Sequence, residues 1–208
     1  MSGRPLIKRR LILLRHGETS YNATSRMQGQ LDTELNPLGV RQAAAAAQVL
    51  AERKPGLVIS SDLTRAADTA RHLVELVDVP LRHDPRLRET FLGEWQGLTH
   101  SEVEQGWPGG LGHWRTDVRY VPPGGESKEQ VAARSVAVVQ EIEPSTWDAH
   151  PVVLVAHGGL ILALAAALLG LPRDSWSTLG SLGNARWAEL STRADGQWRL
   201  DAWNAGVV

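Results

Sequence analysis

Short apolar runs alternate along the chain with longer segments whose apolar residues recur every three to four positions. The short runs are typical of buried strands, and the longer segments are typical of amphipathic helices. The predicted strands are residues 10–14, 57–60, 81–87, 152–156, 185–190 and 198–203. The predicted helices are residues 37–53, 61–77, 127–143 and 160–169. This order predicts an α/β fold, a three-layer α/β/α sandwich whose central sheet is mostly parallel with an antiparallel edge.

Proline, glycine and short polar residues mark the ends of the predicted helices. Pro37 opens the first helix, and Pro55 with the glycine after it ends that helix. Ser61 or Asp62 is expected to cap the second helix, because a side-chain oxygen there can accept from free backbone amides. Gly170 ends the last helix. The second helix is therefore expected to begin directly beyond the carboxyl end of a strand.

Two segments show neither the short apolar runs of strands nor the three- to four-residue spacing of helices. Residues 17–36 are polar and are interpreted as a functional loop. Residues 91–125 are rich in glycine and contain Trp95, Trp107 and Trp114. This composition predicts short helices at most, in a small cap over the site.

The composition is ordinary for a globular protein, with 42% hydrophobic and 22% charged residues. A length of 208 residues suffices for one sizeable core, so residues 1–208 are expected to form a single domain that includes the cap. The formal net charge of -1 gives no overall field toward nucleic acid, and no nucleic-acid partner is expected.

The chain contains no cysteine, which excludes disulfide scaffolds, thiolate zinc sites and cysteine-dependent phosphatase chemistry. The basic segment 1–10 lacks the apolar core and the cleavage site of a signal peptide. The longest apolar run, residues 160–169, is shorter than the ~20 residues that span a bilayer. We therefore expect a cytoplasmic protein with no membrane partner.

Two histidines each follow a strand-like run and each precede a glycine. His16 follows the first predicted strand, and His157 follows residues 152–156. Because ligands bind beyond the carboxyl ends of strands in an open α/β sheet, both imidazoles are expected at one site. Arg15 adds a permanent positive charge that is costly to bury without an anion. Phosphate is the expected ligand, and an unprotonated His16 would be a competent nucleophile.

Each of these residues also has a plain structural interpretation. His16 and His157 could be core histidines that bond to the backbone. Arg65, near the start of the second helix, could be a solvated arginine or a second guanidinium for a phosphate dianion. The helix that begins at Gly158 offers backbone amides to phosphate oxygens, and a protonated His157 could donate to the same oxygens. Their common place at strand ends favours the ligand-binding interpretation.

Glu89 lies just past the third predicted strand and is a candidate general acid. Repulsion from a bound phosphate would favour its protonated form, which could then supply a proton to the leaving oxygen. The alternative is a surface carboxylate paired with a neighbouring arginine. Glu18 and Glu94 compete for the same role, and spacing does not eliminate them.

Several motifs together resemble those of the histidine phosphatase superfamily, the phosphoglycerate mutase-like proteins. The resemblance begins with the motif Leu14-Arg15-His16-Gly17-Glu18-Thr19. The further matching blocks are Asn22, residues 28–29, Asp32, and residues 38–39, 42–43, 60–70, 87–89, 93–97, 124–127 and 156–159. The blocks occur in the family's order and cover most of the chain.

The resemblance implies a phosphoglycerate mutase-like fold and a role for each residue of the site. His16 would become phosphohistidine, and Glu89 would protonate the leaving oxygen and then accept a proton from water. The residues implied to stabilise the phosphoryl group are Arg15, Arg65 and His157, and those implied to bind substrate are Asn22, Gln28 and Gly158. No metal and no other cofactor is implied. Relatives are often dimers, so a homodimer is expected.

The compact segment 91–125 lacks the long insertion that mutases of the family carry, so hydrolysis is expected rather than phosphoryl transfer between substrates. Residues 25–35, 180–185 and 198–204 are similar to those of actinobacterial enzymes that hydrolyse glucosyl-3-phosphoglycerate to glucosylglycerate and phosphate. This small phosphorylated metabolite is therefore the implied substrate. The alternatives are a broad-specificity phosphatase, a cofactor-dependent phosphoglycerate mutase and a non-catalytic module that binds phosphorylated ligands.

The cap offers candidate contacts for the rest of such a substrate. Trp107 and Trp114 could stack on a sugar face, and Arg115 or Arg119 could meet a carboxylate. Alternatively these tryptophans, with Trp95, cover the core beneath the cap.

Overall fold

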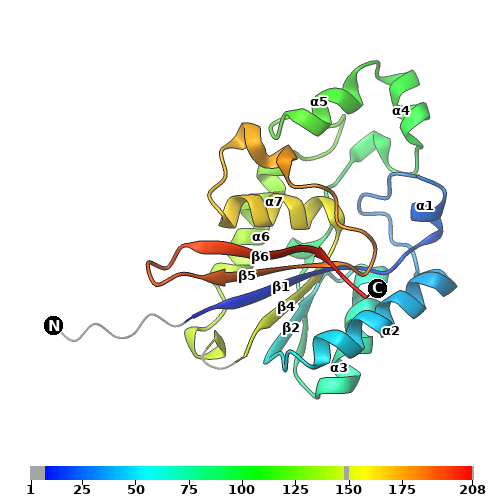
Figure 1. Ribbon diagram of the computed structural model, residues 1–208. Coiled ribbons are helices and arrows are strands. Elements are labelled where there is room, and N and C mark those ends of the chain that lie inside the picture. Colours follow the sequence, from blue (N-terminus) through cyan, green and yellow to red (C-terminus); the bar gives the residue numbers. More distant parts are fainter. Residues whose placement is uncertain (1–7, 148–149, 208) are drawn as a thin grey trace.

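The computed structural model describes residues 8–147 and 150–207, and within them six strands form one sheet in the order β3-β2-β4-β1-β5-β6 (Figure 1). The strands are β1 (Arg10–Arg15), β2 (Leu57–Ser60), β3 (Leu81–His83), β4 (Val152–Ala156), β5 (Trp187–Thr192) and β6 (Trp198–Ala205). The first four are parallel to one another, and β5 and β6 form an antiparallel edge. The predicted mixed sheet is confirmed.

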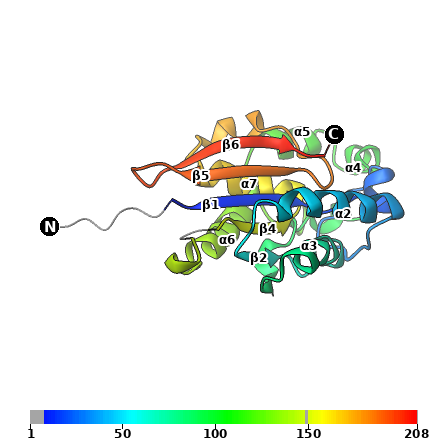
Figure 2. The ribbon, with the colours of Figure 1, turned by 60° about the horizontal axis from the view of Figure 1, so that its bottom comes forward.

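Helices cover both faces of this sheet (Figures 1 and 2). They are α2 (Pro37–Ala51) and α3 (Thr64–Val77) on one face, and α6 (Lys128–Gln140) and α7 (Gly158–Leu168) on the other. The alternation of β1 produces the layers, because Ile12 and Leu14 pack toward α2 and α3 while Leu11 and Leu13 pack toward α6 and α7. The predicted three-layer sandwich is confirmed.

Shorter elements lie toward the carboxyl ends of the parallel strands or connect the larger ones. The short α-helices are α1 (Ser20–Ala23), α4 (His100–Gly106) and α5 (Gly110–Thr116). The 3-10 helices are η1 (Pro85–Leu87), η2 (Gly93–Trp95), η3 (Pro144–Trp147) and η4 (Arg173–Thr178). Helices α4 and α5 stand beyond the sheet at the top of Figure 1. They pack on a separate small core around the fully buried Trp95, with Met27, Leu92, Val103 and Leu111.

Some predicted boundaries are wrong. Strand β3 ends at His83 rather than residue 87, because the Asp84 side chain accepts from the Arg86 amide and starts the 3-10 turn η1. Helix α3 begins at Thr64, with Leu63 at the N-cap and no side-chain capping bond. Asp62, one of the two residues expected to cap this helix, instead forms an ion pair with Arg88, the residue before Glu89.

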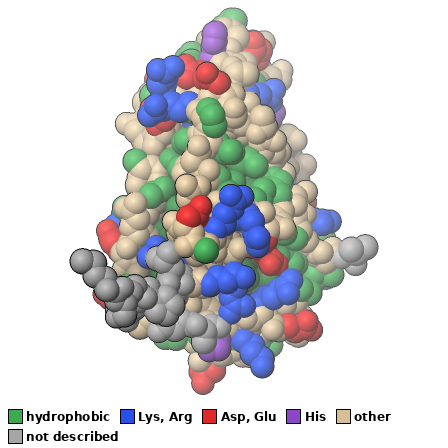
Figure 3. Space-filling model, turned by 60° about the vertical axis from the view of Figure 1, so that its left-hand side comes forward, with side chains coloured by type: hydrophobic (Ala, Val, Ile, Leu, Met, Phe, Trp, Pro, Cys, Tyr) green, Lys and Arg blue, Asp and Glu red, His purple; other side chains and the backbone are tan. Residues whose placement is uncertain are grey.

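Charge is distributed locally over the surface. Figure 3 shows the face that lies on the left of Figure 1, where Lys and Arg side chains gather in the lower half below a band of hydrophobic side chains. Among the described residues, no helix is long and apolar enough to cross a membrane. The amino-terminal segment 1–7, most of the stretch assessed for a signal peptide, lies outside them.

Candidate active site

The candidate site is assembled at the carboxyl ends of three parallel strands. His16 follows β1, His157 follows β4 as the N-cap of α7, and Arg65 lies in the first turn of α3, after β2. Because β1 and β4 are neighbours in the sheet, the two imidazole rings lie with their centroids 5.1 Å apart. The structure thus brings together residues that are far apart in the sequence.

His16 is held in one tautomer. Its Nδ1 lies 2.6 Å from the carbonyl oxygen of Gly17. A carbonyl only accepts hydrogen bonds, so Nδ1 carries the hydrogen and Nε2 keeps its lone pair. Burial, followed by the charges of Arg65 and Arg15, lowers the pKa of His16 well below its ordinary value. The ring is therefore neutral near pH 7, with Nε2 available as a nucleophile.

Two arginines contribute positive charge to the same place. The Arg65 side chain is fully buried, and its Nη1 and Nη2 donate to the carbonyls of Leu31 (2.7 Å) and Gly29 (2.8 Å). Arg15 donates from Nη1 to the carbonyl of Leu182. Burial lowers the pKa of Arg65 to about 10, which is still high enough to keep Arg65 charged at neutral pH. Burial also lowers the pKa of Arg15. The carbonyls therefore fix the guanidinium groups without neutralising them.

Several buried nitrogens at this site lack a partner. Among the described side chains, Arg15 Nε, Arg65 Nε and both ring nitrogens of His157 have no hydrogen bond. Burial, then the charges of Arg65, His16 and Arg15, lowers the pKa of His157 well below its ordinary value. Without a ligand His157 is thus neutral, and one of its nitrogens still carries a hydrogen. Unpaired buried donors around two cations fit an anion with several acceptor oxygens.

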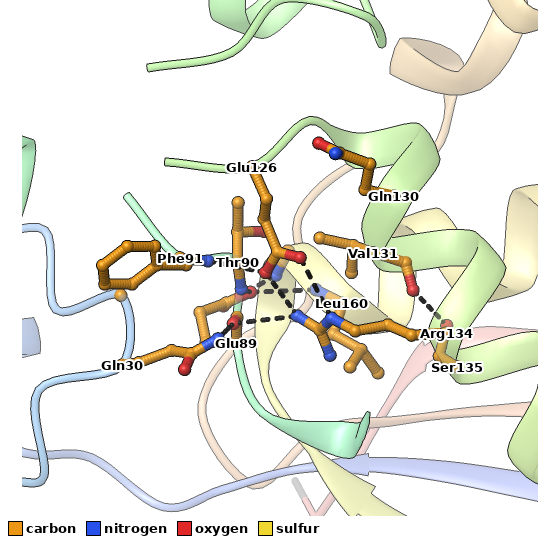
Figure 4. A network of polar contacts seen from close by, with 12 residues as sticks. Gln30, Glu89, Thr90, Phe91, Glu126, Gln130, Val131, Arg134, Ser135 and Leu160 are labelled. Carbon is orange, nitrogen blue, oxygen red and sulfur yellow. Dashed lines mark hydrogen bonds and ion pairs between the residues drawn. The ribbon is translucent and has the colours of Figure 1, made fainter. Parts of the chain in front are cut away.

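Glu89 lies at the amino-terminal end of α7. Its Oε1 accepts from the amides of Thr90 (2.7 Å) and Leu160 (3.0 Å), and all three residues are labelled in Figure 4. Its Oε2 accepts from the amide of Gly159 (3.0 Å). Backbone amides therefore hold the Glu89 carboxylate, and not the surface ion pair with a neighbouring arginine that was the alternative from the sequence. Two of the amides at the start of α7, those of Gly159 and Leu160, are therefore engaged by Glu89.

Gly158, which the resemblance implies binds substrate, lies beside Arg15. A Cβ added at Gly158 would lie 3.4 Å from Arg15 Nε, which is the lower limit of ordinary van der Waals contact. The missing side chain leaves room for the Arg15 guanidinium beside α7.

Asn22 and Gln28 lie in the wall of the same cavity. The Asn22 side-chain oxygen accepts from the Thr19 amide and from Asn184 Nδ2, which also donates to the carbonyl of His16. The Gln28 side-chain oxygen accepts from the hydroxyls of Thr19 and Thr33. Because the oxygens are engaged, the amide NH2 groups are the donors left for a ligand.

The cavity has a volume of about 290 Å³ and two chemically different ends. Arg15, His16, Arg65 and Glu89 line the end formed by the carboxyl ends of the parallel strands and the segments that follow them. The other side chains of the wall include Ser25, Arg26, Met27, Thr90, Leu92, His100 and Trp114. A ligand that fills both ends therefore meets cations at one and a mixed apolar and polar surface at the other.

Only part of the predicted cap chemistry reaches this cavity. Within the described chain, Trp114 lines it, whereas Trp107, Arg115 and Arg119 do not. Trp95 is buried beneath the cap.

Arg26 and His100 line the cavity but were missed from the sequence. Neither follows a strand, and no sequence pattern marks them, because the bridge between Arg26 and Thr99 joins two loops that are distant in the sequence.

Of the three candidate acids, Glu89 belongs to the cavity wall among the described residues, and Glu18 and Glu94 do not. Glu18 instead accepts from the Asn36 side chain. Within residues 8–147 and 150–207, no group of three or more His, Asp or Glu side chains is arranged to hold a metal ion.

Comparison with known proteins agrees with the motif at residues 14–19. The family model of the histidine phosphatase superfamily (branch 1) matches residues 11–206. The chain belongs to the histidine phosphatase superfamily.

Relatives of this histidine phosphatase match more than nine tenths of its length. The chain is 56% identical to a glucosyl-3-phosphoglycerate phosphatase of Mycolicibacterium vanbaalenii, over 96% of both chains. It is 35% identical to a metal-independent phosphoserine phosphatase of Arabidopsis thaliana, over 93% of this chain and 80% of the relative. A solved structure of mycobacterial glucosyl-3-phosphoglycerate phosphatase with VO3 superposes with a TM-score of 0.91 at 54% identity, covering 95% of this chain and all (100%) of that one.

Proposed function

We propose that this histidine phosphatase hydrolyses phosphate monoesters through a phosphohistidine intermediate on His16. The observation that carries the proposal is the free lone pair on His16 Nε2, since Nδ1 is held by the Gly17 carbonyl. That nitrogen lies in a cavity whose wall includes Arg15 and Arg65, beside the unpaired ring of His157. A nucleophile surrounded by donors for a phosphoryl group is what displacement at phosphorus requires.

Two displacements complete the reaction. In the first, His16 Nε2 forms a bond to phosphorus while the ester P–O bond breaks, and a protonated Glu89 donates its proton to the leaving oxygen. In the second, water attacks phosphorus while the N–P bond breaks, and Glu89 accepts the proton of that water. Inorganic phosphate leaves, and Glu89 is protonated again for the next cycle.

Arg15, Arg65 and His157 would stabilise the charge that develops on the phosphoryl oxygens. Their unpaired nitrogens are already in place before a ligand binds, so little reorganisation is needed. A bound phosphate dianion would also favour a proton on His157, because it opposes the neighbouring positive charges that, after burial, lower the pKa of that ring. Asn22 and Gln28 would donate from their amide NH2 groups.

We propose glucosyl-3-phosphoglycerate as the substrate, with glucosylglycerate and phosphate as products. The similarity to phosphatases of that name supports the choice. The cavity extends beyond the phosphoryl end, and Trp114 there offers a flat apolar face for a sugar ring. Arg26 and His100, rather than Arg115 or Arg119, are placed to meet the carboxylate.

The experiment is a measurement of phosphate release from glucosyl-3-phosphoglycerate, 3-phosphoglycerate, phosphoserine and α-ribazole phosphate. We expect the highest kcat/KM with glucosyl-3-phosphoglycerate, and an acid-labile, alkali-stable phosphoenzyme with wild type that is absent from His16→Asn. Full activity of His16→Asn would contradict the nucleophile. Equal kcat/KM across the panel would indicate a broad-specificity phosphatase, and interconversion of 3- and 2-phosphoglycerate without phosphate release would indicate a mutase.

The organisation of the whole protein is part of the proposal. We propose one domain over residues 1–208, with residues 91–125 as its cap, and a homodimer. Sedimentation equilibrium measures the dimer directly. The cytoplasmic location expected from the sequence stays a prediction.

A further inference from the structure

The segment that carries Glu89 has little regular structure of its own. The 3-10 helix η1 ends at Leu87, and the next described element, η2, begins at Gly93. A carboxylate that must reach the leaving oxygen needs a fixed backbone, so contacts from outside the segment have to supply it.

Arg134 of α6 supplies several of those contacts. Its Nη1 donates to the carbonyl of Arg86 (2.6 Å), and its Nη2 donates to the carbonyl of Glu89 itself (3.0 Å). Helix α6 is packed against α7 in the core. Helix α6 thus contacts the backbone on the amino-terminal side of the candidate acid, at Arg86, and at Glu89 itself. Figure 4 shows the contact with Glu89.

Glu126 completes the arrangement on the other side. Its carboxylate accepts from Arg134 Nη2 (2.6 Å) and Nε (3.1 Å), and Oε1 also accepts from the amide of Phe91 (2.8 Å). The Phe91 carbonyl in turn accepts from the Glu126 amide. The side chains of Arg134 and Glu126 are 20% and 17% exposed. A bidentate pair this sheltered is more rigid than an ion pair in open solvent.

We propose that Arg134 and Glu126 are positioning residues for general-acid catalysis, acting as a clamp on residues 86–91 that holds the Glu89 carboxylate on the amides of α7. This inference rests on the proposed role of Glu89 as the acid. The clamp touches the segment at Arg86, Glu89 and Phe91, so loosening it lets the carboxylate move relative to the leaving oxygen. Nucleophilic attack by His16 does not depend on it.

The test compares kcat/KM for an alkyl ester, 3-phosphoglycerate, with that for p-nitrophenyl phosphate, whose leaving group barely needs a proton. Arg134→Lys keeps the positive charge and removes the planar fork, and Glu126→Gln keeps the shape and removes the charge. We expect each to lower the alkyl value by about 10- to 100-fold and the aryl value by no more than about threefold, as weakened acid catalysis predicts. Thermal unfolding identifies any variant that fails to fold, and Glu126→Gln then carries the test.

Arg53→Lys is the matched control, because the Arg53 side chain pairs with Glu189 at the surface and lies outside residues 86–91. Both rates should stay at wild-type values. In a Glu89→Gln background, Arg134→Lys should lower the alkyl value no further, because the acid it positions is already gone.

The clamp would be overturned if Arg134→Lys and Glu126→Gln lowered kcat/KM equally for the alkyl and the aryl ester. It would also be overturned if Arg134→Lys lowered the alkyl value as much in the Glu89→Gln background as in the wild type. Glu89→Gln alone separates this from the proposed function. If Glu89→Gln lowers kcat/KM selectively for the alkyl ester and Arg134→Lys does not, only the clamp is overturned. If Glu89→Gln shows no selective loss for the alkyl ester, Glu89 is not the acid.

Discussion

The chemistry at the residue scale depends on which nitrogen of His16 carries hydrogen. The Gly17 carbonyl decides this by accepting from Nδ1, and burial among arginines keeps the ring neutral. The same burial keeps His157 neutral without a ligand. Both histidines therefore resist protonation in the folded state more than in the unfolded chain, which links folding to pH.

The pH dependence of stability follows from that difference. A histidine in the unfolded chain has a pKa of about 6.5, and the folded values of His16 and His157 are lowered. Their contribution is fully present above the unfolded pKa and is lost as pH falls below it toward the folded pKa, by up to about 1.4 kcal/mol per pH unit for each ring. Urea unfolding without phosphate at pH 7 and pH 5 should show a smaller drop for His157→Asn than for wild type. Equal drops would contradict a buried neutral His157.

At the scale of elements, the amino-terminal end of α7 holds a carboxylate of the protein itself. Positive charge at a helix start favours an anion, and Glu89 takes that place through the amides of Gly159 and Leu160. The helix therefore orients the candidate acid, while side chains are left to bind the phosphoryl group.

Gly159→Ala should disturb that contact specifically. A Cβ there would lie 2.6 Å from Glu89 Oε1, so the carboxylate must shift. We expect kcat/KM for an alkyl phosphate to fall by about tenfold or more, as when a general acid is misplaced. Gly112→Ala in α5 is the control, because its Cβ meets nothing within 4 Å and activity should be unchanged. Steady-state kinetics on both variants make the comparison, and an unimpaired Gly159→Ala would contradict this role of α7.

The cap helices α4 and α5 belong to the same scale, because α5 brings Trp114 to the cavity and α4 brings His100. Trp114→Ala should lower kcat/KM for glucosyl-3-phosphoglycerate by about tenfold, the order expected for an aromatic stacking contact of about 1.4 kcal/mol. The value for p-nitrophenyl phosphate should change little. Trp107→Ala, in the same aromatic cluster but outside the cavity wall, is the control. A parallel loss on both substrates would argue against a sugar contact.

At the scale of the whole molecule, the site exists because separate layers meet at one sheet edge. Arg65 comes from the α3 side of the sheet, and Glu89 is held by α6 and α7 on the other side. Unfolding separates these groups, so an anion that binds among them stabilises the fold as a whole.

Inorganic phosphate should therefore raise the unfolding temperature. At 100 times its dissociation constant it should add about 2.7 kcal/mol to the free energy of unfolding. Arg65→Gln should lose most of this gain, because it removes a buried cation from the phosphoryl end. Differential scanning calorimetry with phosphate, against chloride at equal ionic strength, measures the effect. An equal shift in both salts would show a general salt effect instead.

Strand and helix order was predictable because it depends on local periodicity. The apolar run ending at Leu14 and the run 152–156 both became central strands, and the two histidines after them met as expected from parallel pairing. The third strand was predicted too long, since Asp84 and Pro85 turned the chain by a local bond that apolar spacing does not reveal.

The sequence by itself determined the layers of the sandwich, the family and the residue types at the strand ends, because each depends on neighbours along the chain. The tertiary structure alone decided that the α7 amides hold Glu89, that Arg26 and His100 rather than Arg115 and Arg119 reach the cavity, and that Arg134 donates to the Glu89 carbonyl. Those contacts join positions about 45 to 70 residues apart in the chain. Their geometry follows from how the layers pack, which no local pattern encodes.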